Sequence, residues 1–599
     1  MSAIAAILNR EGSAEARSIR AMLAAAPHRG SDIEVLSQGR CVLGICRHKE
    51  WPESAIATEG GIAVAFTGTI DNCDSLVNEL EGRGLPSIQP TPAGVLLAGF
   101  RVYGEKLPNM LRGAFAAVLT DGSRLWAFRD HVGFKPLFFR EDARGCYLAT
   151  EAKQIVAGAG IPREPDHDVL KRIFYKEYDD NTPSALKGVR RLPKATLLVA
   201  GDDGIVLRRY WQPERLLESA GLSEEDIRDR FGEVMTQAVA RILTGHDVLS
   251  LSGGIDSPAI AAFAAPEYLK LTGRPLPVLS FVFPHLPSVD ERPYIEMIVS
   301  ALGLELHTYE ISANPLDRLR QWADVLDGPV PHIWISDSEE YYRVAKALGF
   351  RTILTGEAAE FLVEMRPFIL QHLIARGRWK AAAEQIRVMR SARRSWKSIG
   401  GQVASTFLPG FVEAAYTRVR RPYRSPRIPD WLDPRVVNEV KARHIVPVRH
   451  RWKDHQLHRF TGPGLSIEVE ADEICQVLCG VRTRMPWADV DLWEFFLSLP
   501  AEVKYPYPQR KALVRRLLRG KVPEPVLDRQ DKTFSDDSVK ERFRYEMIRY
   551  WLLEKPYRLE GVDYKRLTER IEQRRFDTVD ILWSVDLAKI HAFLDLWQE

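Results

Sequence analysis

The stretch that most constrains the fold of this chain is Leu251–Ser257, which reads Leu-Ser-Gly-Gly-Ile-Asp-Ser. An apolar run, Asp247–Ser250, precedes it and a helical pattern, Pro258–Phe263, follows it. This order predicts a strand, a glycine turn and a helix. We expect Ser257 to cap the helix and Pro258 to occupy its first position, where proline gives up no hydrogen bond. The amide groups of the helix N-terminus would then point at the turn.

The composition of the turn is that of a phosphate-binding site. Gly253 and Gly254 let the backbone approach an anion closely. The hydroxyls of Ser252 and Ser257 add donors, and the helix dipole favours negative charge. Asp256 is explained if a divalent metal, most simply Mg²⁺, bridges its carboxylate to the phosphates. A Walker A loop would need a lysine and a wider spacing, which the sequence lacks; the alternative is a turn whose glycines serve only the backbone.

Taken whole, the string Leu251–Ser257 resembles the pyrophosphate loop of ATP pyrophosphatases. Those enzymes split ATP between its α and β phosphates and form an adenylate. The resemblance implies that ATP and Mg²⁺ bind at this turn.

Length and composition indicate the class of protein. The chain has 599 residues, of which 45% are apolar and 27% charged, which is typical of a globular protein with about two to four domains. Its six cysteines form no Cys-x-x-Cys pair, and neither a secretory signal nor a membrane-spanning apolar run is recognised. We therefore expect a cytoplasmic protein with no membrane partner.

The positive charge is concentrated in one segment. The net charge is +3, yet residues 366–460 contain 21 Lys and Arg against 6 Asp and Glu, with aromatic residues between them. Such a segment is typical of a surface that binds a polyanionic or carboxylate-bearing partner. The alternative is that the charges form the solvated face of helices. No recognised RNA module accompanies it, so we expect no nucleic acid partner. We interpret residues 366–464 as a basic helical insertion that borders the acceptor pocket.

The first 210 residues contain short strand patterns that suit an αββα sandwich. Four strings in this region resemble the class II glutamine amidotransferase (Ntn) domain of asparagine synthetase. They are Pro-His-Arg-Gly-Ser-Asp at 27–32, Leu-Arg-Gly-Ala-Phe at 111–115, Arg-Asp-His-Val-Gly-Phe-Lys-Pro-Leu at 129–137 and Leu-Ala-Thr-Glu-Ala-Lys at 148–153.

The residues that carry glutaminase chemistry in that family are changed here. The family's nucleophilic cysteine is Ser2, and a hydroxyl is a far poorer nucleophile than a thiolate at neutral pH. The family's glutamine-gripping Asn-Gly-Glu string is Thr-Gly-Thr at residues 67–69. Arg47 is the candidate remnant of the glutamine-carboxylate clamp. We interpret residues 1–210 as a degenerate scaffold that no longer makes ammonia, the alternative being an amidase with a serine nucleophile.

From Trp211 onward, strands and helices alternate, which predicts a doubly wound parallel sheet. The strand Val278–Phe283 ends where such a sheet places a nucleotide base, so Ser280 and Phe281 are candidates for that contact. This part resembles the synthetase half of asparagine synthetase, which has the ATP pyrophosphatase fold. The sequence thus predicts an α/β protein with two domains, residues 1–210 and 211–599.

Further strings of the synthetase half supply candidate metal and catalytic residues. Residues 355–360, Thr-Gly-Glu-Ala-Ala-Glu, match a family string whose Asp shares the metal, and Glu360 falls at that Asp. Its alternative is a surface charge at a helix start. Glu468, sixteen residues before Arg484, matches an acid that helps to deprotonate the attacking amine in β-lactam synthetase. The alternative role for Glu468 is a surface salt bridge. In β-lactam synthetase a tyrosine partners this acid, and Glu357 stands at the position of that tyrosine here.

Two cations complete the predicted site. Lys511 matches the family's Lys-x-x-x-Arg helix, and Lys532 lies in a loop similar to Arg-Gln-Lys-x-x-Phe-Ser, displaced by one place. A cation there would neutralise the α-phosphate and the oxyanion formed when the amine adds. The candidate residues are Glu357, Glu468 and Lys532 for catalysis; Leu251, Ser252, Gly253, Gly254, Asp256, Ser257, Ser280, Phe281, Gly356 and Lys511 for ATP; and Asp256 and Glu360 for the metal.

Because ammonia from glutamine is not expected, the nucleophilic amine must arrive on a substrate. Lasso peptide cyclases, β-lactam or carbapenam synthetases, and ligases that take a separate amine all fit. The chain's size, its basic and aromatic insertion and the missing tyrosine are most similar to a lasso peptide cyclase. That resemblance implies adenylation of an Asp or Glu side chain of a precursor peptide. The peptide's own N-terminal amine then closes a macrolactam, with AMP and pyrophosphate released.

The same resemblance raises a leader-peptide-binding protein and a leader protease as candidate partners. The alternatives are a β-lactam synthetase-like enzyme for a small molecule, an ammonia-dependent asparagine synthetase, and a binding protein with a decayed nucleotide site.

Overall fold

The computed structural model describes residues 2–10, 12, 16–51, 53–85, 88–176, 183–219, 221–314, 316–332, 334–363, 369–391, 393–407, 428–444, 464–505, 510–529 and 536–597. The predicted catalytic residue Lys532 lies outside these ranges, as does much of the basic segment 366–464.

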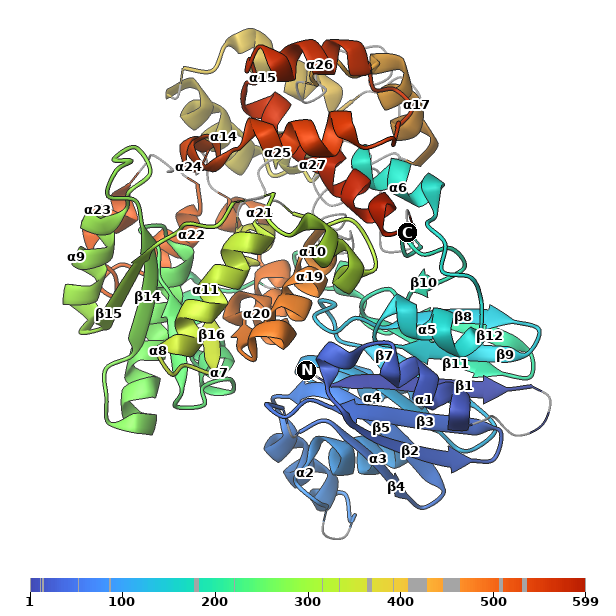
Figure 1. Ribbon diagram of the computed structural model, residues 1–599. Coiled ribbons are helices and arrows are strands. Elements are labelled where there is room, and N and C mark those ends of the chain that lie inside the picture. Colours follow the sequence, from blue (N-terminus) through green and yellow to red (C-terminus); the bar gives the residue numbers. More distant parts are fainter. Residues whose placement is uncertain are drawn as a thin grey trace.

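The N-terminal part of the chain folds into two antiparallel sheets of six strands each (Figure 1). The strand orders are β10-β8-β9-β1-β3-β2 and β12-β11-β7-β6-β5-β4. The strands of the first sheet are β1 (Ala3–Asn9), β2 (Asp32–Gln38), β3 (Cys41–Arg47), β8 (Phe138–Asp142), β9 (Gly145–Ala149) and β10 (Arg190–Arg191). Those of the second are β4 (Ala55–Glu59), β5 (Ile62–Ile70), β6 (Gly113–Thr120), β7 (Leu125–Arg129), β11 (Thr196–Gly201) and β12 (Gly204–Arg209).

Apolar side chains on both faces of these strands produce four layers. Along β1, Ile4 and Ala6 pack between the sheets, whereas Ala5 and Ile7 pack against helices, because successive side chains point to opposite faces. The helices on the outer faces are α1 (Ala16–Ala24) and α5 (Ala152–Ala159) on the first sheet, and α2 (Cys73–Gly82) and α3 (Pro92–Tyr103) on the second. The predicted αββα sandwich is confirmed.

The synthetase part is built on a five-stranded parallel sheet of order β15-β14-β13-β16-β17. Its strands are β13 (Asp247–Ser250), β14 (Pro277–Val282), β15 (Glu305–Glu310), β16 (Thr352–Leu354) and β17 (Arg482–Arg484). The order changes direction between β13 and β16, which is the switch point where open α/β sheets bind ligands.

Helices cover both faces of this sheet, as the prediction of a doubly wound sheet requires. Val248 and Leu279 belong to a core shared with one set of helices, and Leu249 and Val278 to a core shared with the other. The first set includes α10 (Leu319–Leu326), α11 (Ile335–Ala347), α19 (Gly464–Cys479) and α27 (Thr578–Leu594). The second includes α7 (Glu224–Ala240), α8 (Asp256–Thr272), α9 (Arg292–Leu302), α20 (Val490–Ser498) and α22 (Ala512–Leu517).

One local prediction was wrong. The helix after the glycine turn, α8, begins at Asp256, so Ser257 and Pro258 are its second and third residues rather than its cap and first residue. The residue before the helix, Ile255, has no capping side chain. The Ser257 hydroxyl is used inside the turn instead, where it accepts a hydrogen bond from Ser252 N at 3.0 Å.

The remaining elements are mainly helical. They include α4 (Leu107–Met110), α6 (His167–Phe174), α12 (Ala359–Val363), α13 (Ile369–Ala375), α14 (Trp379–Ser391), α15 (Trp396–Ser405), α17 (Pro434–His444), α21 (Ala501–Lys504), α23 (Glu524–Asp528), α24 (Asp536–Arg542), α25 (Tyr545–Arg549) and α26 (Tyr564–Glu572). No helix in the described parts of the chain is both long and apolar enough to cross a bilayer.

Candidate active site

Two loops at the carboxyl ends of β13 and β16 flank the switch point of the parallel sheet. The glycine turn 251–257 follows β13, and residues 355–358 follow β16 and lead into α12. These are the loops that carry most of the predicted ATP and metal ligands. The fold therefore brings together strings that lie about a hundred residues apart in the sequence.

Hydrogen bonds within the glycine turn, and to two side chains outside it, fix its shape. Ser252 and Ser257 hydroxyls lie 3.1 Å apart, and Gly254 N donates to Ser252 Oγ at 3.4 Å. Gly253 N donates to Glu291 Oε2 at 3.0 Å, and Arg529 donates to the Gly253 carbonyl at 3.0 Å. The turn thus has both a carboxylate and a guanidinium against it, an arrangement that an incoming triphosphate would change.

Two glycines are required by close packing around this turn. A Cβ on Gly253 would lie 2.9 Å from Tyr294 Cβ and 3.1 Å from Arg529 Nη1. A Cβ on Gly356 would lie 2.9 Å from Ser257 N and 3.1 Å from Asp256 Cβ. Neither position can take a larger residue without movement of the turn, so the loop after β16 sits directly on the start of α8.

Asp256, the predicted metal ligand, faces a cation in the structure. Lys511 Nζ donates to Asp256 Oδ2 at 2.5 Å, and Trp487 Nε1 donates to the Asp256 carbonyl at 2.9 Å. Lys511 itself has φ 55°, an unusual backbone for a lysine, which aims it from the N-terminus of α22. The structure therefore brings two predicted residues from distant strings into one ion pair beside the phosphate-binding turn.

No group of three or more His, Cys, Asp or Glu side chains in the described ranges is arranged to hold a metal ion by itself. Mg²⁺ takes most of its ligands from water and substrate phosphates and needs only one or two carboxylates. Asp256 at the turn and Glu360 in the first turn of α12 are compatible with that smaller demand. Mg²⁺ at this place would neutralise phosphate charge.

Ser280 and Phe281, at the end of β14, have different environments. Ser280 is buried, and its hydroxyl donates to the Leu251 carbonyl at 2.8 Å, which ties β14 to the start of the turn. Phe281 is exposed, stacks edge-on with Phe283 at 5.7 Å and lines a cavity. An exposed aromatic ring here offers a surface to a base, whereas Ser280 supports the backbone.

A cavity of about 830 Å³ extends from the end of the parallel sheet to the N-terminal sandwich. Its walls come from residues between Pro136 and Ile590, with contributions from α6, α10, α11, α19 and α27. Its lining includes Phe138, Glu151, Ile173, Phe174, Arg191, Phe281, Tyr309, Trp334, Tyr342, Thr355, Glu357, Glu360, Glu468, Glu470, Asp472, Arg542, Leu582 and Ile590. None of the described residues of the basic segment lines it, and the rest of that segment lies outside the described ranges, so its expected place beside the pocket stays a prediction.

Carboxylates gather on the wall of this cavity nearest the sheet. Glu357 and Glu468 are exposed to the cavity, and Glu360 and Asp472 line it beside them. Enclosure by protein, followed by the charges of Asp472, Glu360 and Glu468, holds the pKa of Glu357 well above its ordinary value. The same enclosure, with the charges of Glu360 and Asp472, raises the pKa of Glu468 to about 7. Glu468 is thus poised to exchange a proton near neutral pH.

Asp472 is a site residue that the sequence interpretation missed. Burial raises the pKa of its carboxyl, while the hydrogen bond from Tyr342 opposes the rise. Tyr342 OH donates to Asp472 Oδ2 at 2.6 Å, and Thr483 Oγ1 donates to Tyr342 OH at 3.0 Å. The available signal was spacing, since Asp472 lies four residues after Glu468 and therefore on the same side of α19. Arg529 was also passed over in favour of Lys532 in the same string.

The described residues at the centre of the N-terminal sandwich are closely packed. Ser2 is fully buried, its hydroxyl accepts a hydrogen bond from His48 N at 3.0 Å, and its carbonyl accepts one from Thr67 Oγ1 at 2.9 Å. The space beside residues 67–69 amounts to about 10 Å³. Arg484 reaches in from β17, donates to Thr69 Oγ1 at 2.7 Å and pairs with Asp71.

Arg47, the candidate clamp for a glutamine carboxylate, is occupied elsewhere. It pairs with Asp32, 3.2 Å away, and with Glu34 on the adjacent strand. These contacts place its guanidinium on a surface ladder of charges between β2 and β3.

Comparison with known proteins agrees with this architecture. Residues 230–599 match the family described as asparagine synthase, and residues 1–211 match the glutamine amidotransferase domain family. Asparagine synthetase (glutamine-hydrolyzing) 3 of Bacillus subtilis (strain 168) is 25% identical over 492 residues, which cover 79% of this chain and 75% of that protein. The carboxyethyl-arginine beta-lactam-synthase of Streptomyces clavuligerus is 28% identical over 220 residues, 36% of this chain and 40% of that protein.

Among solved structures, a glutamine phosphoribosylpyrophosphate amidotransferase from B. subtilis is 16% identical and covers 55% of this chain and 79% of its own, with a TM-score of 0.28. That score is too low to bear on the fold. The family match, by contrast, spans the parallel sheet, both loops at its switch point and the carboxylate wall. The chain belongs to the asparagine synthase family and is an ATP-dependent amide-forming ligase.

Proposed function

We propose that this ligase is a lasso peptide cyclase. Its substrates are ATP and a precursor peptide, in which an Asp or Glu side-chain carboxyl is joined to the peptide's own N-terminal amine. A leader-peptide-binding protein and a leader protease are the partners proposed with it, because the peptide's amine must be freed before the ring can close.

The observation that carries the proposal is the cavity of about 830 Å³ between the carboxylate wall and the N-terminal sandwich. Pockets that enclose a whole drug-sized ligand measure about 300–1,000 Å³. ATP takes the part of this space beside Phe281, and the apolar lining nearer the sandwich, which includes Phe138, Ile173 and Phe174, suits a peptide rather than free aspartate. A folded segment of peptide fits the volume better.

The charges in the cavity support one orientation of the substrate. Cations meet at the glycine turn, where Lys511 and Arg529 lie, and carboxylates gather along the wall formed by Glu357, Glu468 and Asp472. A carboxyl group to be activated is therefore favoured beside the turn. An ammonium group is favoured beside the wall, which attracts it and stabilises its charge.

The proposed chemistry has two steps. The substrate carboxylate attacks the α-phosphorus of ATP, and the bond to the β-phosphate breaks with release of pyrophosphate. The neutral amine then attacks the activated carbonyl carbon, AMP leaves, and the amine's proton passes to the Glu468 carboxylate. With its pKa raised to about 7, Glu468 can accept that proton at neutral pH and release it afterwards.

The source of nitrogen is the other support for a substrate that carries its own amine. A hydroxyl stands at the family's nucleophile position, Ser2, and Arg484 fills the neighbouring space. A ligase without a working glutaminase must receive its amine ready made.

Intact-mass measurement on a candidate leaderless peptide tests the proposal. With ATP and Mg²⁺, we expect the peptide to lose one water, while AMP and pyrophosphate form in equal amounts. If ADP and orthophosphate were the nucleotide products, or if aspartate with ammonium gave asparagine efficiently, the cyclase proposal would be wrong.

A second candidate is ring closure within a small molecule. The similarity to the carboxyethyl-arginine beta-lactam-synthase favours it, although that match covers 36% of this chain. The same nucleotide assay separates the two, because a small β-amino acid would then drive pyrophosphate release whereas peptides would not.

A further inference from the structure

The helix α19 carries carboxylates on two nearly opposite sides. Glu468 and Asp472 face the cavity, one turn apart. At 3.6 residues per turn, Glu470 and Glu473 fall on the other side of the helix, toward the sandwich, although Glu470 also lines the cavity. In Figure 1, α19 (orange) lies beside the N-terminal sandwich (blue to cyan). One helix therefore joins the proposed catalytic wall to the domain that lacks a working glutaminase.

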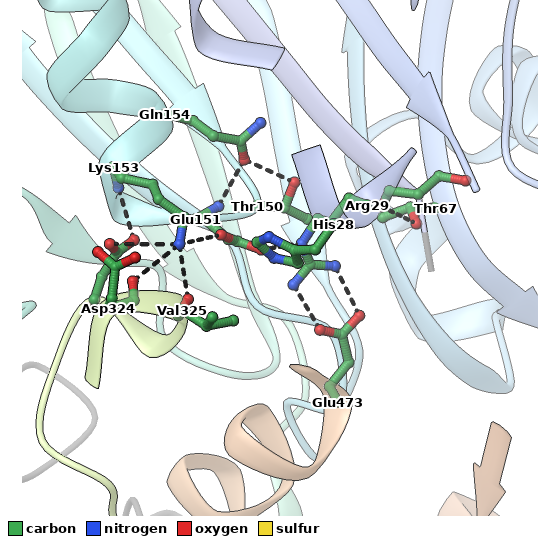
Figure 2. Close-up of polar contacts among 12 residues, drawn as sticks. His28, Arg29, Thr67, Thr150, Glu151, Lys153, Gln154, Asp324, Val325 and Glu473 are labelled. Carbon is green, nitrogen blue, oxygen red and sulfur yellow. Dashed lines mark hydrogen bonds and ion pairs between the residues drawn. The ribbon is translucent and has the colours of Figure 1, made fainter. Parts of the chain in front are cut away.

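Glu473 is held by an arginine of the N-terminal domain. Arg29 Nη1 and Nη2 donate to the two Glu473 oxygens at 3.0 and 2.7 Å, and Arg29 Nε donates to Glu151 (Figure 2). Arg29 is 0% exposed and Glu473 is 1% exposed. Such a two-pronged contact fixes both the distance and the angle between its partners.

The Arg29 side chain is also fixed by Glu151, which has further partners of its own. Glu151 accepts from His28 at 2.7 Å and from Lys153 at 3.1 Å (Figure 2). Lys153 in turn donates to the Val325 carbonyl at 2.8 Å, in the last turn of α10. The network therefore extends from α19 through the sandwich and back to the synthetase part.

Glu470 has an equivalent anchorage one turn away. Arg129 Nη1 donates to Glu470 Oε1 at 2.8 Å, and Arg191 Nε donates to Glu470 Oε2 at 2.8 Å. Arg129 is also fully buried and donates to the Leu192 carbonyl at 3.1 Å. Two successive turns of α19 are thus clamped by arginines of one domain.

Stability alone is a weak explanation for this arrangement. Replacing a buried ion pair by well-packed apolar residues is often neutral or stabilising, because desolvation offsets the attraction. What apolar packing does not reproduce is the fixed direction of the contact. Catalytic groups must be held to within about 0.5 Å of their productive geometry, and a displacement of about 1 Å can lower a rate on the order of a hundredfold.

We infer that the N-terminal domain positions the catalytic side of α19, with Arg29 and Arg129 as positioning residues for Glu468 and Asp472. The inference rests on the proposed function for the role of Glu468, but the clamp itself is a property of the fold. It gives the glutaminase-like domain a part in amide formation that needs no ammonia.

Two variants test the clamp, with one control. Arg29→Met removes the buried guanidinium, and Glu473→Gln keeps the shape while leaving Arg29 its contact with Glu151. Arg112→Met is the control, because Arg112 pairs with Asp491 at 2.8 Å across the same two parts of the chain without touching α19. Amide hydrogen exchange of residues 464–479 and turnover of the candidate peptide are measured on each.

We expect exchange in residues 464–479 to rise on the order of tenfold in both variants and not in the control. We expect kcat to fall at least about tenfold, KM for ATP to stay within about twofold, and the midpoint of the pH profile to move because Glu468 is displaced. If the two variants only lowered the stability of the fold, the midpoint of the pH profile would not move. Unchanged exchange and kcat in Glu473→Gln would overturn the inference, whether or not Arg29→Met folds.

The two proposals fail in different ways. If no peptide reacts with the wild-type protein, the cyclase proposal is wrong, while amide exchange still decides whether the clamp exists. If peptides react and the variants behave as wild type in both measurements, only the clamp is wrong.

Discussion

At the scale of single residues, Glu468 is the group whose ionisation the proposed reaction depends on most. Its pKa is raised from 4.5 to about 7, and only its ionised form can accept a proton. The rate of amide formation should therefore rise with pH, with a midpoint near 7. Glu468→Gln should remove this rise and lower kcat by about 10²–10⁴-fold. Initial rates between pH 5 and 9 measure both effects.

The control for that experiment is Glu340→Gln. Glu340 is a carboxylate of α11 that accepts hydrogen bonds from Ser312 N at 2.9 Å and Ala313 N at 2.8 Å, outside the cavity lining. A pH midpoint that persists in Glu468→Gln would assign proton transfer to another group, with Glu357 and Asp472 the first to examine.

The same ionisation affects stability in the opposite direction. A carboxyl whose folded pKa is raised binds its proton more tightly in the folded state, so stability falls as pH rises from about 4.5 to about 7. Glu468→Gln should therefore be more stable than wild type at pH 8 and equal to it at pH 4. Because water in the cavity screens the charge, we expect a gain of about 1 kcal/mol rather than the full value of the shift. Thermal unfolding at the two pH values measures it.

Lys511 is the residue at which sequence and structure together make a sharp prediction about ATP. Lys511→Met removes the ammonium beside Asp256 at the phosphate-binding turn. A charge-assisted contact contributes about 1.5–3 kcal/mol, so the Kd for ATP should rise about 10- to 100-fold. Calorimetric titration with MgATP measures this. Lys521→Met, which removes a cation stacked on Phe263 at 5.1 Å, should leave the Kd unchanged.

The roles of site residues could be predicted where one short motif contains them. They could not be predicted where residues from two distant motifs come into contact. The glycines and hydroxyls of the turn 251–257 predicted a phosphate-binding site. The ion pair between Asp256 and Lys511 joins residues 255 positions apart, and no local pattern encodes it. Asp472 and Tyr342 were missed for the same reason, since their hydrogen bond depends on how α11 packs against α19.

At the scale of elements, the approach of the loop after β16 to the start of α8 is the contact that shapes the ATP site. A methyl group on Gly356 would lie 2.9 Å from Ser257 N, a distance at which the turn must move. Gly356→Ala should therefore weaken ATP binding about tenfold or more while the protein stays folded. Titration calorimetry and thermal unfolding measure the two properties.

Gly232→Ala is the matched control, because a Cβ there meets nothing within 4 Å in the middle of α7. It should raise stability by about 1 kcal/mol through helix propensity and leave ATP binding as it is. Equal ATP affinity in Gly356→Ala and wild type would mean that the turn adapts without loss.

Element positions followed closely from periodicity, and their exact ends did not. The predicted strand 247–250 coincides with β13, and Val278–Phe283 lies one residue from β14 (Pro277–Val282). The start of α8 was misplaced because Ser257 has the chemistry of a cap, yet its hydroxyl serves the turn. Caps are decided by tertiary hydrogen bonds as well as by residue type.

At the scale of the whole molecule, the relation between the two domains could not be read from the sequence. The strings showed that the glutaminase residues are altered, but not that Arg484 crosses from the synthetase sheet to Thr69 and Asp71. Likewise, nothing local indicated that Arg29 would meet Glu473, 444 positions away. Such contacts arise only when two complete domains pack together.

The filled centre of the sandwich leads to a prediction about restoring the lost nucleophile. Ser2→Cys supplies the thiol used by class II amidotransferases, yet the space beside residues 67–69 is about 10 Å³ and Arg484 closes it. Glutamine therefore has no place to bind, and the variant should release no glutamate from glutamine above the blank. Mass spectrometry must first show that Met1 is removed, so that the thiol has a free amine beside it. Glutamate release by Ser2→Cys would mean that the centre opens in solution, and the nitrogen for amide formation would then have a second possible source.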